Sequence, residues 1–181
     1  LRCNSSCGYC NLPLNVGRYE MSRQEIRNVF AGLYRDGLRL VFVQGGEPLL
    51  RRDLPDILQD LVEIGFHLTV ITNGTKLTPH LVQQFDDLSV SLSISLDTLD
   101  RNRYERIRGA DQLPAVLAGL DLLDEVGPSV EFDRRALLDL RPRRLRAAHF
   151  VTLSIRAAIS GQYSGVISTP IDSKPSRYAA S

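Results

Sequence analysis

A short β-type segment followed by a helical segment repeats along the chain, and this alternation constrains the fold more than any other feature of the sequence. Residues 39–44, 67–72 and 89–97 have the composition of strands, and each is followed by a turn and by apolar residues at helical spacing. Repeated strand-helix units form parallel sheets with right-handed crossovers. The sequence therefore predicts an α/β fold.

The length of the repeating part limits how many units it can hold. A closed barrel of eight units takes about 250 residues, so residues 1–133 hold roughly four to five. Residues 129–133 are expected to begin one more strand, whereas only Leu1 and Arg2 precede the first cysteine, so the first unit lacks its strand. We expect a partial (β/α) barrel rather than a closed one.

Residues with known preferences for helix ends mark the expected helices. Ser22, with Glu25 three residues later, matches a capping box, and Thr78-Pro79 is a typical helix start. This start favours a turn into a helix over a hairpin at the preceding Asn73-Gly74 pair. The glycines expected to end helices are Gly37, Gly65, Gly109 and Gly127.

The segment 89–97 alternates strictly between apolar and polar side chains. A strand covered by helices on both faces would be apolar on both sides, so this strand is expected to face outer helices on one side and a polar interior on the other. The two sets are Val90, Leu92, Ile94 and Leu96, and Ser89, Ser91, Ser93, Ser95 and Asp97. Ser95 and Asp97 then share the inner face at the end of the strand.

All three cysteines of the chain, Cys3, Cys7 and Cys10, lie within eight residues. The spacing CxxxCxxC suits a metal better than a disulfide, because one pair would leave a thiol over, and it is the first indication of an iron-sulfur site. Haem attachment is excluded because Asn11 follows the last cysteine. Zinc stays an alternative, but it needs a fourth ligand, and no histidine stands at suitable spacing among His67, His80 and His149.

Several polar motifs follow the expected strands directly. Gly45-Gly46-Glu47-Pro48, Asn73-Gly74, and Ser95 with Asp97 each stand where a strand ends, and the cysteine loop precedes the first helix in the same way. Parallel α/β folds carry their chemistry at this edge. Each motif alone is commonly a turn or a helix cap. Together, in register, they predict one rim with a common site.

These motifs resemble those of the radical S-adenosylmethionine (radical SAM) superfamily, over residues 1 to about 133. Its signature CxxxCxφC has an aromatic residue at φ, which is Tyr9 here, and its GGE motif matches Gly45-Gly46-Glu47. Asn73-Gly74 and the pair Ser95 and Asp97 match landmarks after the third and fourth strands of that family. The resemblance implies a partial barrel of the radical SAM type.

The resemblance also implies a mechanism. Cys3, Cys7 and Cys10 would ligate three irons of a 4Fe-4S cluster, and S-adenosylmethionine would chelate the remaining iron through its amino and carboxylate groups. Reductive cleavage would give methionine and a 5'-deoxyadenosyl radical that abstracts a hydrogen atom from the substrate. The cofactors supply the difficult chemistry, and the protein binds and shields them.

Roles for further residues follow from the same resemblance. Tyr9 is expected near the adenine, Gly45 and Gly46 along the methionyl part, where a missing Cβ permits close approach, and Glu47 at the cationic amino group. Arg108 would pair with the carboxylate, the alternative being a solvated arginine at a helix end. Hydrogen bonds to ribose or carboxylate are expected from Asn73, Ser95 and Asp97.

The distribution of charge divides the chain at residue 133. Residues 1–133 carry a net charge of −6, with 13 Lys and Arg against 19 Asp and Glu, whereas residues 134–181 carry +7, with 9 against 2. A nucleic-acid-binding tail would show interleaved aromatic residues or a known module, and neither is found. We expect residues 134–181 to be an irregular, basic, Ser- and Pro-bearing extension foreign to the core, without the Gly-rich strand or auxiliary cysteines of the family.

The expected function is that of a radical SAM enzyme acting on a peptide or a cofactor precursor, since the motifs resemble relatives of pyrroloquinoline quinone and molybdenum cofactor maturation enzymes. A flavodoxin or ferredoxin would donate the electron. Reduced thiols indicate the cytoplasm, and no run of about eighteen apolar residues could cross a membrane. The alternatives are an inactive remnant and a small metal-binding module that does not cleave S-adenosylmethionine.

Overall fold

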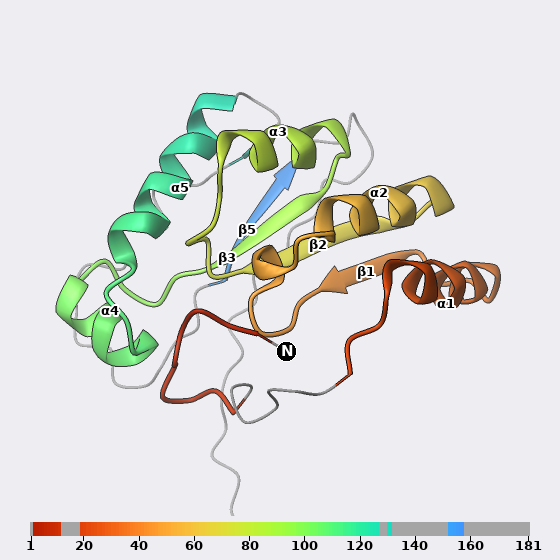
Figure 1. The fold of residues 1–181 in the computed structure, drawn as a ribbon. Helices are drawn as coiled ribbons and strands as arrows, with labels where there is room; N and C mark the ends of the chain where they lie inside the picture. Colours follow the sequence, from red (N-terminus) through yellow and green to blue (C-terminus); the bar gives the residue numbers. More distant parts are fainter. Residues whose placement is uncertain (1, 12–18, 127–129, 132–151, 158–181) are drawn as a thin grey trace, which may run out of the picture.

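The computed structural model describes residues 2–11, 19–126, 130–131 and 152–157, which form a sheet and the helices packed on it (Figure 1). The strands are β1 (Leu40–Val43), β2 (His67–Thr72), β3 (Ser91–Ser95), β4 (Val130–Glu131) and β5 (Thr152–Ala157). The helices are α1 (Arg23–Arg35), the 3-10 helix η2 (Pro48–Leu50), α2 (Leu54–Ile64), α3 (Pro79–Asp87), α4 (Arg101–Arg108) and α5 (Leu113–Val126).

The sheet has the order β1-β2-β3-β5-β4, and its first three strands are parallel. This parallel part confirms the α/β fold and is consistent with a partial barrel. The strand expected near residue 130 is present as β4, but it does not pair with β3, because β5 lies between them and runs antiparallel to both.

Strand β5 lies within residues 134–181, where an irregular structure is expected. Residues 152–155 of this strand pair with β3, in the register Ser93 with Ser154 and Ser95 with Thr152, so this segment departs from that expectation. The division of the chain at residue 133 stays a prediction.

The helix ends follow the capping signals of the sequence. The Ser22 hydroxyl accepts from the Glu25 backbone N–H at 3.3 Å, and the Glu25 carboxylate accepts from the Ser22 backbone N–H at 2.8 Å, which completes the capping box. Thr78 caps α3 through Leu81. Gly65 and Gly109 end α2 and α4 with φ of 112° and 70°, in the left-handed region that favours glycine. Gly127, the expected end of α5, lies outside the described residues.

The apolar core lies between one face of the sheet and the helices. Val41 and Val43 of β1 are in register with the buried Leu68 and Val70 of β2, and Val70 is in register with the buried Leu92 of β3. These residues pack with apolar side chains of α2, α3 and α5. The alternation predicted for residues 89–97 is confirmed on this face, where Val90, Leu92, Ile94 and Leu96 are all buried.

The opposite face of the parallel strands differs from the expected polar interior. Ser91 and Ser95 of β3 are half-buried, but Ser93 is fully buried, and its hydroxyl has no hydrogen-bond partner among the described residues. On β1 the same face carries Leu40 and Phe42, which are both exposed. This face is therefore polar along β3 and apolar along the edge strand.

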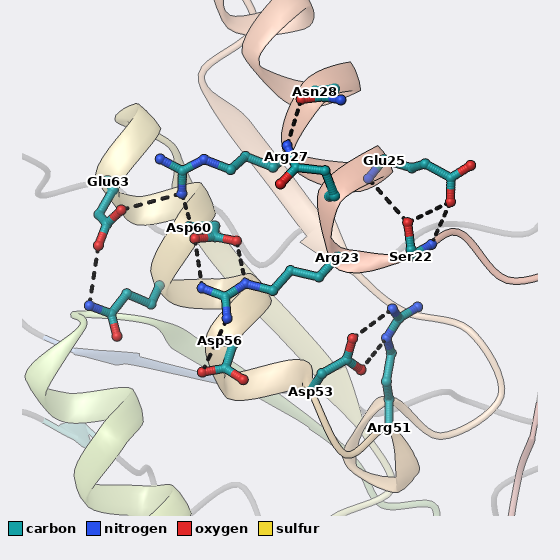
Figure 2. Close-up of polar contacts among 12 residues, drawn as sticks. Ser22, Arg23, Glu25, Arg27, Asn28, Arg51, Asp53, Asp56, Asp60 and Glu63 are labelled. Atoms are coloured by element: carbon teal, nitrogen blue, oxygen red, sulfur yellow. Dashed lines mark hydrogen bonds and ion pairs between the residues drawn. The ribbon is translucent and has the colours of Figure 1, made fainter.

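Helix α1 contains no fully buried residue; it contacts α2 through an ionic cluster (Figure 2), and its Ile26, Phe30 and Tyr34 side chains pack against the apolar core. The buried Asp60 carboxylate accepts from Arg23 Nε and Nη2 at 2.6 and 2.9 Å and from Arg27 Nη1 at 2.5 Å. Phe30 adds an edge-to-face contact with Phe66, with ring centroids 5.6 Å apart. None of the helices in the described ranges is long and apolar enough to cross a membrane.

Candidate cofactor site

The C-terminal ends of the three parallel strands bring the sequence motifs to one edge of the sheet. The Gly45-Gly46-Glu47-Pro48 turn follows β1, Asn73-Gly74 follows β2, and Asp97 follows β3. The N-terminal segment runs along this edge, from beside η2 toward α4 (Figure 1). We call residues 3–10 the cysteine loop, and the strand ends with this loop the rim.

Arg2, directly before the cysteine loop, lies against the backbone of Gly46 and Glu47. The Arg2 carbonyl accepts from the Glu47 backbone N–H at 2.7 Å. A Cβ atom at residue 46 would lie 2.1 Å from the same carbonyl oxygen, a distance that the structure cannot accommodate. The second glycine of the GGE motif is therefore required for the passage of the chain itself, before any ligand is considered.

Asn73 joins the cysteine loop to the end of β2. Its side-chain N–H donates to Asn4 Oδ1 at 2.8 Å, and the Asn4 side-chain N–H donates to Thr75 Oγ1 at 2.7 Å. The Asn73 Oδ1 atom accepts from the Thr75 backbone N–H at 3.0 Å. Asn73 is buried, so the structure shows it supporting the loop.

A second set of contacts comes from the turn before α5. Gln112 accepts from the Ser5 hydroxyl at 2.9 Å and donates to the Asn4 carbonyl at 2.8 Å. Ser5 is buried, although it lies in a loop. Asn4, Ser5, Thr75 and Gln112 were not identified from the sequence. The small polar residues between the cysteines were a signal for Asn4 and Ser5 only.

Helix α4 holds the far side of the cysteine loop by its backbone. The carbonyls of Arg108 and Ile107, at the end of the helix, accept from the backbone N–H groups of Ser6 and Gly8 at 2.9 and 3.1 Å. A Cβ atom on Gly109 would lie 2.6 Å from the Ser6 carbonyl oxygen. Gly109 thus serves both the left-handed helix end and this close approach.

Arg108 links the end of β3 to a cysteine. Its Nε donates to Asp97 Oδ2 at 2.5 Å, its Nη2 donates to the Ser95 carbonyl at 3.0 Å, and its Nη1 lies 3.8 Å from Cys7 Sγ. The side chain is buried, which excludes the alternative of a solvated arginine at a helix end. Asp97 therefore meets an internal cation, and Ser95 takes part through its backbone carbonyl.

Two tyrosines flank this guanidinium, each with its ring centroid 5.9 Å from Arg108 Cζ. Tyr9 is 49% exposed, and the partial burial of its hydroxyl raises its pKa. Tyr104 is fully buried, and burial likewise raises its pKa. The Tyr104 hydroxyl has no hydrogen-bond partner among the described residues. The Tyr9 ring thus stays half exposed at the rim, whereas Tyr104 holds a buried hydroxyl that makes no hydrogen bond within the described residues.

Glu47 is the buried anion of the rim. Its Oε1 accepts from Thr72 Oγ1 at 2.6 Å and from the Leu49 backbone N–H at 3.1 Å, and its Oε2 accepts from the Asn73 backbone N–H at 2.8 Å. All of these donors are neutral, and no Lys or Arg of the described residues pairs with Glu47. The part of the chain that the structure describes therefore supplies Glu47 with hydrogen bonds but with no cation.

The three cysteines are free thiols: Cys3 is exposed, and Cys7 and Cys10 are half-buried. Within the described ranges, no three His, Cys, Asp or Glu side chains converge as ligands of a single metal ion. A cluster places each thiolate on a different iron, so its ligands stand farther apart than the ligands of one ion. Three thiols on one anchored loop match the three protein ligands of an iron-sulfur cluster, whereas a structural zinc site takes four ligands.

Comparison with known proteins agrees with this donor set. The family model described as the Radical SAM superfamily matches residues 1–134. The chain is 36% identical over 145 residues to a GTP 3',8-cyclase of Erythrobacter litoralis, covering 75% of this chain and 43% of the relative. It is 35% identical over 136 residues to molybdenum cofactor biosynthesis protein 1 of Drosophila melanogaster, covering 70% and 23%. The chain thus spans less than half the length of these relatives.

Solved structures share the fold. Streptococcus suis SuiB bound to precursor peptide SuiA superposes with a TM-score of 0.63 at 22% identity, covering 70% of this chain and 29% of that one. The native protein anSMEcpe with bound AdoMet gives a TM-score of 0.58 at 20% identity, covering 68% and 38%. The family match over residues 1–134, which contains the anchored cysteine loop and the GGE turn, shows that this chain belongs to the radical SAM superfamily.

Proposed function

We propose that this chain is part of an enzyme that binds a 4Fe-4S cluster through Cys3, Cys7 and Cys10 and cleaves S-adenosylmethionine reductively. When bound, the cluster supplies the electron that splits the sulfonium into methionine and a 5'-deoxyadenosyl radical, which abstracts a hydrogen atom from the substrate. The observation that carries this proposal is the anchoring of a three-cysteine loop beside the buried, uncompensated carboxylate of Glu47.

Glu47 is suited to attract the amino group of S-adenosylmethionine. A buried carboxylate with only neutral donors gains most from a cation that brings its own charge. The three hydrogen bonds to Thr72, Leu49 and Asn73 fix the position of the carboxylate before a ligand arrives. The Gly45-Gly46 backbone would lie along the methionyl part.

The remaining roles follow the positions of the side chains. Tyr9, half exposed between two cysteines, would lie against the adenine. Arg108 has N–H groups beyond those that bind Asp97, Ser95 and Cys7, and they would serve the carboxylate of the ligand. Hydrogen bonds to ribose or carboxylate are proposed for Asn73, Ser95 and Asp97.

The substrate proposed first is a cofactor precursor of the nucleotide class. Support comes from relatives at 33% to 36% identity that are named GTP 3',8-cyclase. A peptide substrate is the second candidate, because the solved structure with a TM-score of 0.63 is titled as bound to a precursor peptide. We propose flavodoxin or ferredoxin as the electron donor, and the cytoplasm, where thiols stay reduced, as the location.

The test is anaerobic reconstitution of the full chain with iron and sulfide, followed by dithionite, S-adenosylmethionine and GTP. We expect bound iron and the formation of 5'-deoxyadenosine. In Cys7→Ala the iron should be lost. Ser6→Ala is the matched control, because the contact of Ser6 with α4 uses the backbone and survives the substitution.

Each alternative gives its own result in that experiment. An inactive remnant would yield no 5'-deoxyadenosine, and a small metal-binding module would hold metal without cleaving S-adenosylmethionine. Iron retained in full by Cys7→Ala would contradict the assignment of the ligands. Formation of 5'-deoxyadenosine that depends on an added peptide, and not on GTP, would favour the peptide substrate.

A further inference from the structure

Gln112 occupies a rigid position directly before helix α5. Its backbone carbonyl accepts from the N–H groups of Ala115 and Val116 at 3.0 and 3.2 Å, which fixes the residue to the first turn. The helix is anchored in turn by the buried side chains of Leu113 and Val116. The side chain of Gln112 is therefore presented by a part of the fold that cannot shift without disturbing the core.

The Gln112 side-chain amide binds the cysteine loop through both its oxygen and its N–H group. The oxygen accepts from the Ser5 hydroxyl, and the N–H group donates to the Asn4 carbonyl. Only an amide side chain of this length offers an acceptor and a donor side by side, since a carboxylate lacks the donor and an ammonium group lacks the acceptor. The two contacts fix a backbone carbonyl and a neighbouring side chain at the same time.

These contacts lie between two of the proposed cluster ligands. Asn4 follows Cys3 directly, and Ser5 stands two residues before Cys7. From the other side, Asn73 and Thr75 hold the Asn4 side chain. Asn4 is thus held at two points. Its side chain hydrogen-bonds to residues that follow β2, and its carbonyl accepts from Gln112 before α5.

We propose that Gln112 is a positioning residue that fixes the direction of the Cys3 and Cys7 thiols and so sets how tightly the cysteine loop retains its cluster. The inference rests on the proposed cluster site. It assigns to the start of α5 a part in metal retention, although no residue of that helix is itself a ligand. Groups that orient metal ligands commonly change metal affinity by about 10- to 100-fold when they are removed.

The experiment measures the release of iron from the reconstituted full chain to a ferrous chelator at 25 °C, beside the electron paramagnetic resonance spectrum of the reduced cluster. Gln112→Leu, which removes both contacts, should release iron about 10-fold faster. Gln112→Glu keeps the acceptor for Ser5 but loses the donor, so an intermediate rate and an altered spectrum are expected. Gln83→Leu is the matched control, because the exposed Gln83 side chain donates to Asp87 within its own helix, α3.

Ser5→Ala in combination with Gln112→Leu separates positioning from general stability. The Ser5 hydroxyl shares one of the two Gln112 contacts and also accepts from the Asn73 side-chain N–H at 3.4 Å. Because one contact is common to both residues, the double variant should speed iron release by less than the product of the effects of Ser5→Ala and Gln112→Leu alone. If Gln112→Leu does not fold, as judged by circular dichroism, the comparison of Gln112→Glu with Gln83→Leu decides in its place.

The outcomes distinguish this inference from the function on which it rests. A wild-type chain that takes up no iron would overturn both. A wild-type chain that holds iron, beside folded Gln112 variants that release it at the wild-type rate with an unchanged spectrum, would overturn the inference alone. A lowered melting temperature with an unchanged release rate would also count against it, since it would show a structural role only.

Discussion

Asp60 and Glu47 are equally buried carboxylates, 5% and 4% exposed, but they meet opposite surroundings. Asp60, on α2, receives two arginines of α1, with N–O distances of 2.5 to 2.9 Å. Glu47, on the rim, receives a hydroxyl and two backbone N–H groups and no cation of the described residues. The chain neutralises the first charge internally and leaves the second one available.

The difference shows that the partners of a buried carboxylate, rather than its burial, indicate its role. A carboxylate that is paired with arginine stabilises the contact between two helices and gains little from an external cation. A charge held only by neutral dipoles is fixed in position but still favours an external cation. Figure 2 shows how completely the Asp60 oxygens are occupied by guanidinium groups.

The largest effect in this comparison is expected for Gly46→Ala on the rim. The added Cβ would lie 2.1 Å from the Arg2 carbonyl oxygen, so the segment before Cys3 must move away. We expect reconstituted iron to be lost and the free energy of unfolding to fall by about 2 kcal/mol, measured by metal analysis and urea denaturation. Gly8→Ala is the control in the same loop, because nothing lies within 4 Å of its added Cβ. Retention of iron by Gly46→Ala would contradict the close passage.

The next effect is expected for Asp60→Ala, which leaves Arg23 and Arg27 without their shared partner. The free energy of unfolding should fall by roughly 2 kcal/mol, because a buried charge-assisted contact between helices is lost. Iron content should stay at the wild-type level. The control is Asp56→Ala, which removes only a 3.6 Å pair between largely exposed side chains and should cost under about 0.5 kcal/mol. Loss of iron in Asp60→Ala would remove the distinction between the two regions.

Glu47→Gln tests the available charge directly, with Asp60→Asn as its counterpart. The substitution preserves the shape of the side chain and removes the charge, so the affinity for S-adenosylmethionine should fall about tenfold, or about 1.4 kcal/mol. Calorimetric titration of the reconstituted protein measures it. Asp60→Asn should bind S-adenosylmethionine as the wild type does. Equal affinities in all three proteins would show that Glu47 acts only as a support for Thr72 and Asn73.

The smallest effect is a dependence of stability on pH. Hydrogen bonds from Arg23, followed by the contribution of Arg27, hold the pKa of Asp60 below its ordinary value of 3.8. The stabilisation is therefore present above pH 3.8 and is lost as the pH falls through the lower, folded-state pKa. Urea midpoints between pH 5 and pH 2 should decline more steeply in the wild type than in Asp60→Asn. Parallel curves would contradict this assignment.

The secondary structure could be predicted closely from the sequence because its signals are local. The capping box joins residues three positions apart, and β2 occupies the residues 67–72 that were predicted for it. The position of the rim could then be predicted from the ends of the strands, since parallel strands end at a common edge of the sheet. Family motifs supplied the cysteines and the GGE turn.

The contacts that assemble the site could not be predicted in this way. Ser5 and Gln112 are 107 positions apart, and no spacing rule connects them. The clamp on Asp60 joins Arg23 and Arg27 to a residue 37 and 33 positions away, and no local signal connects them. The pairing of β5 with β3 was also missed, because the arginine-rich surroundings concealed the alternating sequence Thr-Leu-Ser-Ile-Arg-Ala of residues 152–157.

The anchoring of the cysteine loop also has a consequence for the order of folding. Its side-chain contacts span 68 to 108 positions, from the pair of Ser5 with Asn73 to the pair of Asn4 with Gln112, whereas the α1–α2 clamp spans 33 to 37. Contacts between distant segments form late, because a long stretch of chain must be ordered first. The three thiols should therefore reach their final arrangement only after β2, α4 and α5 are in place, and metal that arrives earlier would meet a loop without its supports.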